Sequence, residues 1–427
     1  MRRFPSPLAA LTPIAPLAIL AALATACGAT GAEPLGQQAD PIINGVPSTA
    51  DQDYAIGLAI LDTNGQYMAG CSGSLIAENL VLTARHCVSQ TVGEGVSCSS
   101  SGKPLSGTGG VSGDYLPKQL AVLIGPTIDL SGGGFNPKFA AVGTQIFHTS
   151  VDNLCNNDIA LILLDHKIAG AKLAQLRLDA PPVAGELMTA IGWGVANNTT
   201  SQIPSRRTRK DIPVVKVGPA NLGVNGGLGP HEFAIGEGIC SGDSGGPAVA
   251  QTTGAVIGVV SRGGNGAAAD PNNPAASCVN TTAADGTTYK ASNFYTRIDG
   301  FPDLLATAFQ AAGAEPWLEG QPDPRKAKFG EPCDGPDACR TALCIGVGAG
   351  TQCSQTCDTA TPCPTGYGCV SAGTQSVCAP VSADAPATSS SGGCTVGSNG
   401  VDAGRASLAL TMGLAGLALA VAARRRR

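Results

Sequence analysis

The chain has 427 residues, enough for roughly two or three domains. Its 26 Lys and Arg residues against 31 Asp and Glu residues give a formal net charge of −5, which excludes a basic nucleic-acid-binding surface over the whole chain. Apolar residues make up 43% and charged residues 13%, so a charge-rich disordered protein is also excluded. Sixteen cysteines indicate an oxidising compartment, and 58 glycines and 30 prolines favour loops and strands over long helices.

The N-terminus has the pattern of an export signal. Two arginines follow Met1, and an apolar stretch ends in Ala24-Thr25-Ala26, which matches a small-residue cleavage pattern. We expect residues 1–26 to be a signal peptide and residues 27–41 a propeptide. Cys27 follows the cleavage pattern directly, so the alternative to ordinary cleavage is lipidation of this thiol.

Residues 42–313 contain short apolar runs separated by Gly, Asn, Asp and Pro. Such runs have the length of strands bounded by turn residues, so this region is predicted to be all-β. One helix is expected near its end, because Pro302 stands at a first-turn position before residues 303–309. The expected strands include residues 54–61, 80–84, 119–124, 159–164 and 255–260.

Three motifs stand out in this region. They are Thr83-Ala84-Arg85-His86-Cys87, Asn157-Asp158-Ile159-Ala160-Leu161 and the Gly-rich loop Cys240-Ser241-Gly242-Asp243-Ser244-Gly245-Gly246-Pro247. These residues resemble the signatures T-A-A-H-C, D-I-A-L and G-D-S-G-G-P of the trypsin-like serine peptidases, which have the chymotrypsin fold. The resemblance covers residues 42–313 and implies two six-stranded antiparallel β-barrels with a C-terminal helix.

The residue types suit a serine nucleophile. A serine hydroxyl is a weak nucleophile and needs an adjacent base. The resemblance implies that His86 takes the proton of Ser244 and gives it to the leaving amine, while Asp158 fixes the His86 tautomer and stabilises its charged form. It also implies that the amides of Gly242 and Ser244 form the oxyanion hole. We therefore expect a serine endopeptidase that needs no metal or cofactor.

The start of this region, Ile42-Ile43-Asn44-Gly45, resembles the I-V-G-G N-terminus of mature enzymes in the family. There a cut frees an ammonium that pairs with the Asp before the nucleophile, which implies a pair between Ile42 and Asp243. A buried ion pair persists only with good geometry, so it suits a switch that orders the oxyanion loop. We expect a zymogen. Because Pro41 precedes the cut, another protease rather than a trypsin-like autocatalytic cut is expected to activate it.

The resemblance also assigns a pocket for the residue before the cut bond. Gly238 takes the base position, so a preference for Arg or Lys is not indicated. Ser261, Gly263 and Asn293 form the walls, and Asn293 replaces a usual Gly, so a small or medium uncharged residue is expected. The alternative is a basic preference through Glu237, if the loop is shifted by one residue.

The cysteines divide into two groups. Six lie between residues 71 and 278 and eight between residues 333 and 378, and both even counts suit disulfides. The resemblance implies the pairs Cys71–Cys87 and Cys240–Cys278. Cys98 and Cys155 remain, and we expect them to pair with each other.

Residues 329–380 form a small disulfide-rich module after a linker at residues 314–328. About fifty residues cannot bury a core large enough to fold unaided, so four disulfides would supply the constraint. Zinc is the competing hypothesis, but the segment has no histidine and no C-x-x-C pair. The sequence leaves the pairing open. A spacer or adhesion role is expected.

A second linker, residues 381–393, precedes a tail at residues 394–427. The apolar segment 408–423 is at the short edge for a transmembrane helix, and the terminal arginines favour a cytoplasmic end. Gly392-Gly393-Cys394, this segment and the arginines resemble the C-terminal sorting tail of myxobacterial surface proteins. The resemblance implies a sorting enzyme as partner and retention at the cell surface. The alternative is a plain tail anchor.

A different class of function is an inactive homologue that serves as a surface adhesion or binding protein. Arg85 beside His86, Arg262 in place of a usual Trp, and the residue before Ile42 motivate this alternative. Against it, no triad or oxyanion residue is missing. The expected partners are protein or peptide substrates and an activating protease, without nucleic acid. The choice between broad digestion and processing of one partner stays open.

Overall fold

The computed structural model describes residues 42–92, 95–105, 107–127, 138–194, 205–222, 226–266 and 274–381. The expected signal peptide, propeptide, second linker after residue 381 and sorting tail with its transmembrane segment lie outside these residues. Among the helices that are described, none has the length and apolar character to cross a membrane.

Six strands close the first barrel, and every neighbouring pair is antiparallel. Three of the strands are buried along their whole length, which explains why the sequence shows continuous apolar runs there rather than alternation. In spatial order the strands are β2 (Ala55–Leu61), β3 (Tyr67–Ala77), β4 (Leu80–Thr83), β9 (Ala160–Leu164), β8 (Ala141–His148) and β7 (Leu120–Leu123).

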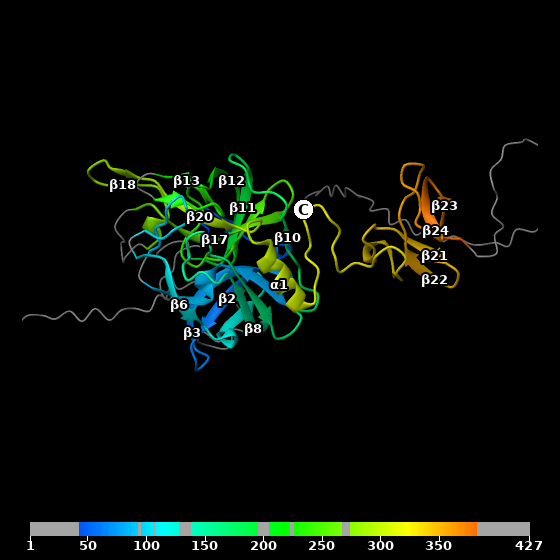
Figure 1. Cartoon of the computed structure of the whole chain (residues 1–427), viewed down its shortest axis with the longest axis horizontal. Coiled ribbons are helices and arrows are strands. Elements are labelled where there is room, and N and C mark those ends of the chain that lie inside the picture. The colour runs from blue at the N-terminus through cyan, green and yellow to red at the C-terminus, as the bar shows by residue number, and fades with distance from the viewer. Residues whose placement is uncertain are drawn as a thin grey trace, which may run out of the picture.

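The second barrel is a ring of six strands that β12 and β15 close by pairing with each other. Its strands are β12 (Arg207–Val217), β11 (Leu187–Gly192), β16 (Pro247–Ala250), β17 (Ala255–Gly264), β20 (Ser292–Arg297) and β15 (Glu232–Ile235). Figure 1 shows the two barrels one above the other. The prediction of two six-stranded barrels is confirmed.

Shorter elements decorate the barrels. β1 (Val46–Pro47) pairs with β12, and β10 (Gln175–Leu176) pairs with β17 in parallel, which is the exception to the antiparallel expectation. Three hairpin-like pairs lie in loops: β5 (Ser89–Val92) with β6 (Gly110–Asp114), β13 (Ala220–Asn221) with β14 (Gly227–Leu228), and β18 (Thr281–Thr282) with β19 (Thr288–Tyr289).

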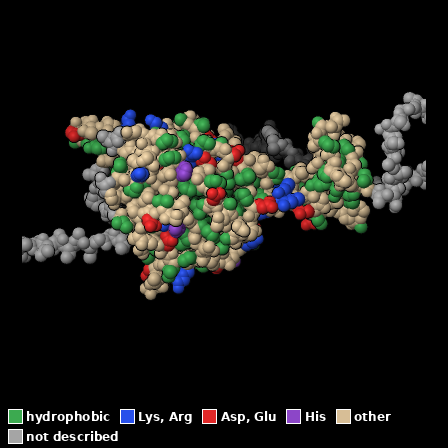
Figure 2. Space-filling model, in the orientation of Figure 1, with side chains coloured by type: hydrophobic (Ala, Val, Ile, Leu, Met, Phe, Trp, Pro, Cys, Tyr) green, Lys and Arg blue, Asp and Glu red, His purple; other side chains and the backbone are tan. Residues whose placement is uncertain are grey.

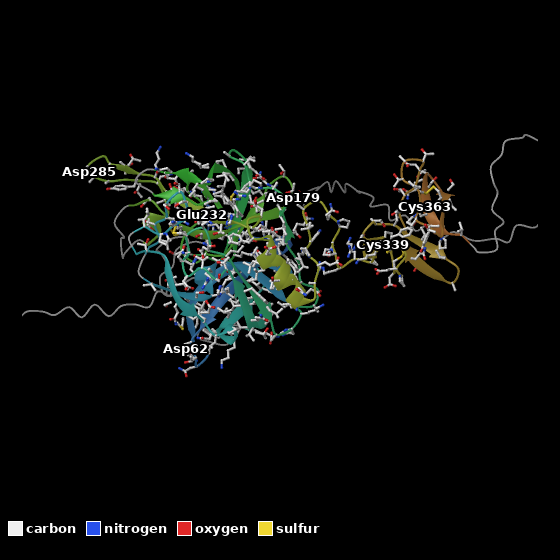
Figure 3. The ribbon with its side chains drawn as sticks, in the orientation of Figure 1. Asp62, Asp179, Glu232, Asp285, Cys339 and Cys363 are labelled. Atoms are coloured by element: carbon white, nitrogen blue, oxygen red, sulfur yellow. A yellow bond between two sulfur atoms is a disulfide. The ribbon has the colours of Figure 1, made fainter. Side chains whose placement is uncertain are left out.

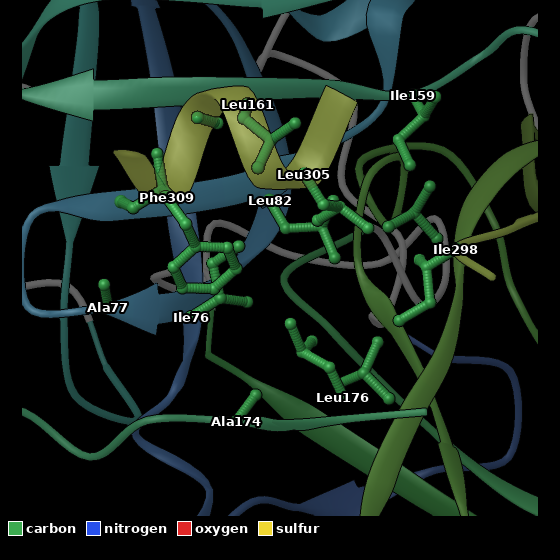
Figure 4. Packing of buried hydrophobic residues seen from close by; sticks show 14 of the residues in the cluster. Ile76, Ala77, Leu82, Ile159, Leu161, Ala174, Leu176, Ile298, Leu305 and Phe309 are labelled. Atoms are coloured by element: carbon green, nitrogen blue, oxygen red, sulfur yellow. The ribbon is translucent and has the colours of Figure 1, made fainter. Parts of the chain in front are cut away.

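An apolar cluster joins the two barrels to the helix α1 (Pro302–Ala312). Pro302 occupies the first turn, as the sequence predicts. Gly313 ends the helix with a φ of 60°, in the left-handed region that favours glycine. The cluster therefore seals the seam between the barrels under one short helix (Figure 4), with members that include Ile76, Leu82, Leu161, Leu176, Ile298, Leu305 and Phe309.

The segment expected as a linker, residues 314–328, lies against the large domain. The Leu176 amide donates to the Trp317 carbonyl at 2.8 Å. Arg177 Nε donates to Glu319 Oε2 at 2.7 Å, and charged side chains gather where this segment leads to the module (Figure 2). These contacts anchor the segment to the surface of the barrel.

The small module consists of two tandem copies of one four-cysteine unit. In each unit the first cysteine bonds to the third and the second to the fourth. An antiparallel hairpin carries the third and fourth cysteines opposite each other. The disulfides are Cys333–Cys344, Cys339–Cys353, Cys357–Cys369 and Cys363–Cys378, and the hairpins are β21 (Cys344–Val347) with β22 (Gly350–Cys353) and β23 (Tyr367–Ala372) with β24 (Gln375–Pro380).

The pairing answers the question that the sequence left open. All eight sulfurs are in S–S bonds, so the structure does not support the zinc hypothesis. The repeat is also visible in the sequence: successive cysteines are six, five and nine residues apart in the first unit and six, six and nine apart in the second.

The two units are expected to be coupled in stability, because Ile345 of the first packs in one apolar cluster with Ala372 and Val377 of the second. Replacing both cysteines of the Cys363–Cys378 pair by Ser opens a link over 15 residues, which costs about 3 kcal/mol. Limited thermolysin digestion followed by mass spectrometry should then show cuts between residues 357 and 378 and faster cutting within residues 333–353 than in the wild type. Cuts confined to the second unit would contradict the coupling.

Candidate active site

Strand pairing brings His86 and Asp158 together. His86 lies on a single 3-10 turn, Arg85–Cys87, directly after β4, and Asp158 lies two residues before β9. These strands are antiparallel, with Thr83 at the end of β4 opposite Ala160 at the start of β9. The side chains that follow β4 and precede β9 therefore lie next to each other. His86 Nδ1 lies 2.8 Å from Asp158 Oδ2, and the His86 amide donates to Asp158 Oδ1 at 3.0 Å.

Asp158 is a buried carboxylate with 1% of its surface exposed. The Ser261 hydroxyl donates to Asp158 Oδ2 at 2.7 Å. Burial by itself raises the pKa of Asp158, but the charge and hydrogen bonds of His86 and the Ser261 hydroxyl together hold this pKa below its usual 3.8. The carboxylate is thus ionised at neutral pH, where it can orient and stabilise the imidazole ring.

The loop that carries Ser244 comes from the second barrel, and Ser72 of the first barrel fixes it. The Ser72 amide donates to the Ser244 carbonyl at 2.7 Å, and its hydroxyl donates to the Gly242 carbonyl at 3.0 Å. Gly242 has a φ of 87°, and a Cβ there would lie 2.7 Å from the Gly194 Cα, so only glycine fits. Ser244 and His86 line one cleft of about 560 Å³.

Asp243 is fully buried beside this loop. Its Oδ2 accepts hydrogen bonds from the amides of Ile42 at 3.0 Å and Cys240 at 2.9 Å, and its Oδ1 accepts one from the Gly194 amide at 2.9 Å. Ile42 is fully buried as well. The structure therefore brings Ile42 and Asp243 within hydrogen-bond distance.

Comparison with known proteins agrees with this architecture. The family model described as Trypsin matches residues 42–283. The chain belongs to the trypsin family. It is similar to Trypsin Blo t 3 of Blomia tropicalis, with 29% identity over 208 residues that make up 45% of this chain and 67% of the relative. Hypodermin-A of Hypoderma lineatum is 26% identical over 240 residues, 54% of this chain and 80% of the relative.

A third relative, Trypsin of Sarcophaga bullata, is 28% identical over 233 residues, 52% of this chain and 78% of the relative. The family membership makes this chain a serine endopeptidase, a hydrolase of peptide bonds. The seven disulfides among the described residues fit an oxidising, extracellular environment.

Three disulfides brace the peptidase cleft, in the same pairs as expected. One ties β3 to the turn of His86, one ties an insertion at residues 93–117 to the segment before Asp158, and one ties the Ser244 loop to the segment before β18. The pairs are Cys71–Cys87, Cys98–Cys155 and Cys240–Cys278, with S–S distances of 2.03, 1.98 and 2.03 Å.

The peptidase pocket differs from the expectation at one position. Ser261, Gly263 and Asn293 line the cleft, and Asn293 Nδ2 donates to the Gly236 carbonyl at 2.7 Å. Gly238 does not line it. A Cβ at Gly238 would lie 3.0 Å from Ile235 Cδ1 and 3.2 Å from Ile212 Cδ1, so a side chain there would enter the barrel core. The neighbouring Ile239 lines the cleft in its place.

Glu237 lies outside the cleft lining and has other partners. It accepts hydrogen bonds from Asn44 Nδ2 at 2.8 Å and from the Asn280 amide at 2.9 Å, and Arg209 Nη1 lies 4.0 Å away. The alternative of a basic preference through Glu237 is therefore not supported.

The motifs missed one wall of the cleft. Val96 and Gly109 of the insertion line it together with Val92 and Leu154. The expected Cys98–Cys155 pair could have indicated this wall. A disulfide between the insertion and the segment before Asp158 places the insertion next to the cleft.

Removing the Ser261 hydroxyl should destabilise the fold in a pH-dependent way. Ser261→Ala removes a hydrogen bond to a buried charge, which costs about 2 kcal/mol. Because the folded pKa of Asp158 is depressed, this loss is full above about pH 4 and vanishes as the pH falls through the folded pKa. Urea unfolding across a pH series measures it.

The matched control is Ser74→Ala, because the buried Ser74 hydroxyl has no hydrogen-bond partner among the described residues. Its effect on the free energy of unfolding should be small and the same at every pH. Equal pH profiles for the two variants would contradict the role of Ser261.

Proposed function

We propose that the peptidase cleaves peptide bonds with Ser244 as nucleophile, His86 as general base and acid, and Asp158 as the orienting carboxylate. The observation that carries the proposal is the 2.8 Å contact between His86 Nδ1 and the buried Asp158 carboxylate, in the same cleft as Ser244. A ring that donates its Nδ1 proton to Asp158 keeps Nε2 as an acceptor, which is the tautomer that a base needs.

In this mechanism the Ser244 oxygen attacks the substrate carbonyl while His86 Nε2 takes the hydroxyl proton. The carbonyl oxygen becomes an oxyanion, which the amides of Gly242 and Ser244 stabilise. His86 then gives its proton to the leaving amine as the C–N bond breaks, and an acyl-enzyme remains. Water, deprotonated by His86, hydrolyses the acyl-enzyme and restores Ser244.

We propose an uncharged residue of small or medium size before the cut bond. Asn293 supports this, because it lies opposite Gly263 across β17 and β20 and is 2% exposed. A Cβ on Gly263 would lie 1.9 Å from Asn293 Oδ1, so the amide occupies the space between the two strands. The apolar Ile239 lines the cleft beside it.

The inactive-homologue alternative is not favoured, because the arginines that motivated it have partners. Arg85 is 3% exposed, and its Nη1 donates to the carbonyls of Thr149 at 2.9 Å and Val151 at 3.0 Å. Arg262 forms an ion pair with Glu232 at 2.5 Å. The Arg85 guanidinium is therefore buried outside the cleft lining, and the charge of Arg262 is paired.

The proposal includes a zymogen that is cut before Ile42. In the uncut chain Ile42 has a φ of 52°, which strains a β-branched residue. A cut between Pro41 and Ile42 frees this torsion and converts the amide near Asp243 into an ammonium. We also propose export by the signal peptide at residues 1–26, activation by another protease, and surface retention through the tail at residues 394–427.

A fluorophosphonate probe tests the triad. The wild-type chain should be labelled on Ser244, whereas Ser244→Ala and His86→Ala should lower the labelling rate and peptide hydrolysis by about 10⁴-fold or more. Ser371→Ala, at an exposed serine of the small module, is the control and should label like the wild type. Mass spectrometry locates the label, and a label elsewhere than on Ser244 refutes the proposed nucleophile.

A designed cut tests the zymogen. Pro41→Arg gives trypsin a site before Ile42, and cutting there should raise the Ser244 labelling rate by about 100- to 1,000-fold, the effect of an oxyanion donor. The further change Asp243→Asn should abolish this rise. Mass spectrometry verifies a chain that begins at Ile42. Equal labelling before and after the cut would mean that the single chain is already active.

A further inference from the structure

A second buried carboxylate, Glu232, lies in the second barrel at the start of β15 (Figure 3). It is fully buried, and each of its oxygens accepts two hydrogen bonds. Oε1 accepts from the Asn156 amide at 3.0 Å and from Arg262 Nη1 at 2.5 Å. Oε2 accepts from the Gly229 amide at 2.7 Å and from Arg262 Nη2 at 3.0 Å. The triad mechanism does not use this group.

Arg262 lines the cleft that holds Ser244 and His86. Its guanidinium carbon lies 4.6 Å from the centroid of the Phe294 ring, which also lines the cleft. Two parallel hydrogen bonds and contact with a ring face fix the orientation of a planar guanidinium. The Arg262 side chain is therefore a rigid part of the cleft wall.

The same carboxylate reaches the segment of the triad. Asn156, whose amide it binds, is two residues before Asp158, and Arg262 follows Ser261, whose hydroxyl binds Asp158. Glu232 therefore connects Arg262, which follows Ser261, to the segment that contains Asn156 and Asp158. A buried pair of this kind leaves an uncompensated charge when one member is removed.

We propose that Arg262 and Glu232 form a positioning pair for substrate binding. Arg262 presents a flat wall to a substrate residue next to the cut bond, and Glu232 fixes the direction of this wall and cancels its charge. The proposal rests on the proposed function, because it needs a substrate bound at Ser244.

The substrate class follows from this neutral wall. Phe294, which lies against the Arg262 guanidinium, is apolar, and the cleft lining also includes the apolar Leu154 and Val96, so the wall accepts an apolar substrate side chain. Without Glu232 the cleft would carry a guanidinium charge, which attracts a carboxylate. The pair thus makes a protein substrate with an apolar residue near the cut bond preferable to one with Asp or Glu there.

The experiment profiles cut sites in a peptide library with the full chain and four variants. Glu232→Gln leaves the guanidinium charge, Arg262→Met leaves the carboxylate, and the double variant leaves neither. Arg177→Met is the matched control, because Arg177 also holds a carboxylate, Glu319, through two hydrogen bonds but does not line the cleft. Fluorophosphonate labelling of Ser244 reports for each variant that the triad is assembled.

The wild type and the control should prefer an apolar residue at one position near the cut bond. Glu232→Gln should gain at least about tenfold in cleavage of peptides with Asp or Glu at that position. The double variant should show no such gain. A Glu232→Gln enzyme that labels normally and keeps the wild-type profile would overturn the proposal, as would the same acidic gain in the double variant.

If Glu232→Gln does not label because it fails to fold, Arg262→Lys decides. Lysine keeps the charge but loses the two-pronged contact. KM for the apolar peptides should then rise about tenfold with kcat retained, and an unchanged KM would overturn the proposal. Failure of the proposed function is a different result: the wild-type chain, cut before Ile42, would neither label nor hydrolyse any peptide.

Discussion

The buried carboxylate of Asp243 is the constraint on which the cleft depends. It accepts hydrogen bonds from three amides: those of Ile42 and Gly194, which come from distant segments, and that of Cys240 at the start of the Ser244 loop. The close approach of Asp243 also requires glycine at positions 192 and 194, because a Cβ there would lie 2.1 or 2.6 Å from Asp243 Oδ1. These glycines and this aspartate therefore form one closely packed unit beside the Ser244 loop.

The same physical device recurs twice in the domain. Asp158 accepts hydrogen bonds from His86 of the first barrel and Ser261 of the second, and Glu232 accepts from Asn156 and Arg262. Hydrogen bonds to a buried ionised group are about twice as strong as neutral ones, and they are directional. Aromatic residues make up only 4% of the chain, so few large side chains are present to fix loops by packing. Carboxylates with several donors perform that task around the cleft.

The sequence predicts most of this domain because its signals are local. Apolar runs of strand length mark the barrels, and the motifs around His86, Asp158 and Ser244 carry the candidate triad. The features that the sequence did not predict depend on the direction of side chains and on partners that are distant in the sequence. Motif spacing assigned the pocket base to Gly238, but the direction of a side chain at that position, into the barrel core, is a property of the fold. Arg262 and Glu232 are 30 residues apart and neither belongs to one of the three motifs, so only the folded strands reveal the pair.

Strand β17 also connects the cleft to the small module. Near its C-terminal end it bears Ser261 and Arg262, with an irregular register against β20 between Val260 and Arg262 that turns successive side chains to different partners. Near its N-terminal end Val256 pairs with Leu176 of β10, whose amide binds the Trp317 carbonyl of the segment that leads to the module. The C-terminal end of β17 thus contributes Ser261 and Arg262 to the cleft, and its N-terminal end pairs with β10, which contacts the segment before the module. The short parallel pair of β10 with β17, which the sequence did not indicate, therefore helps to hold the connecting segment on the barrel, together with the Arg177–Glu319 and Arg325–Ala171 contacts.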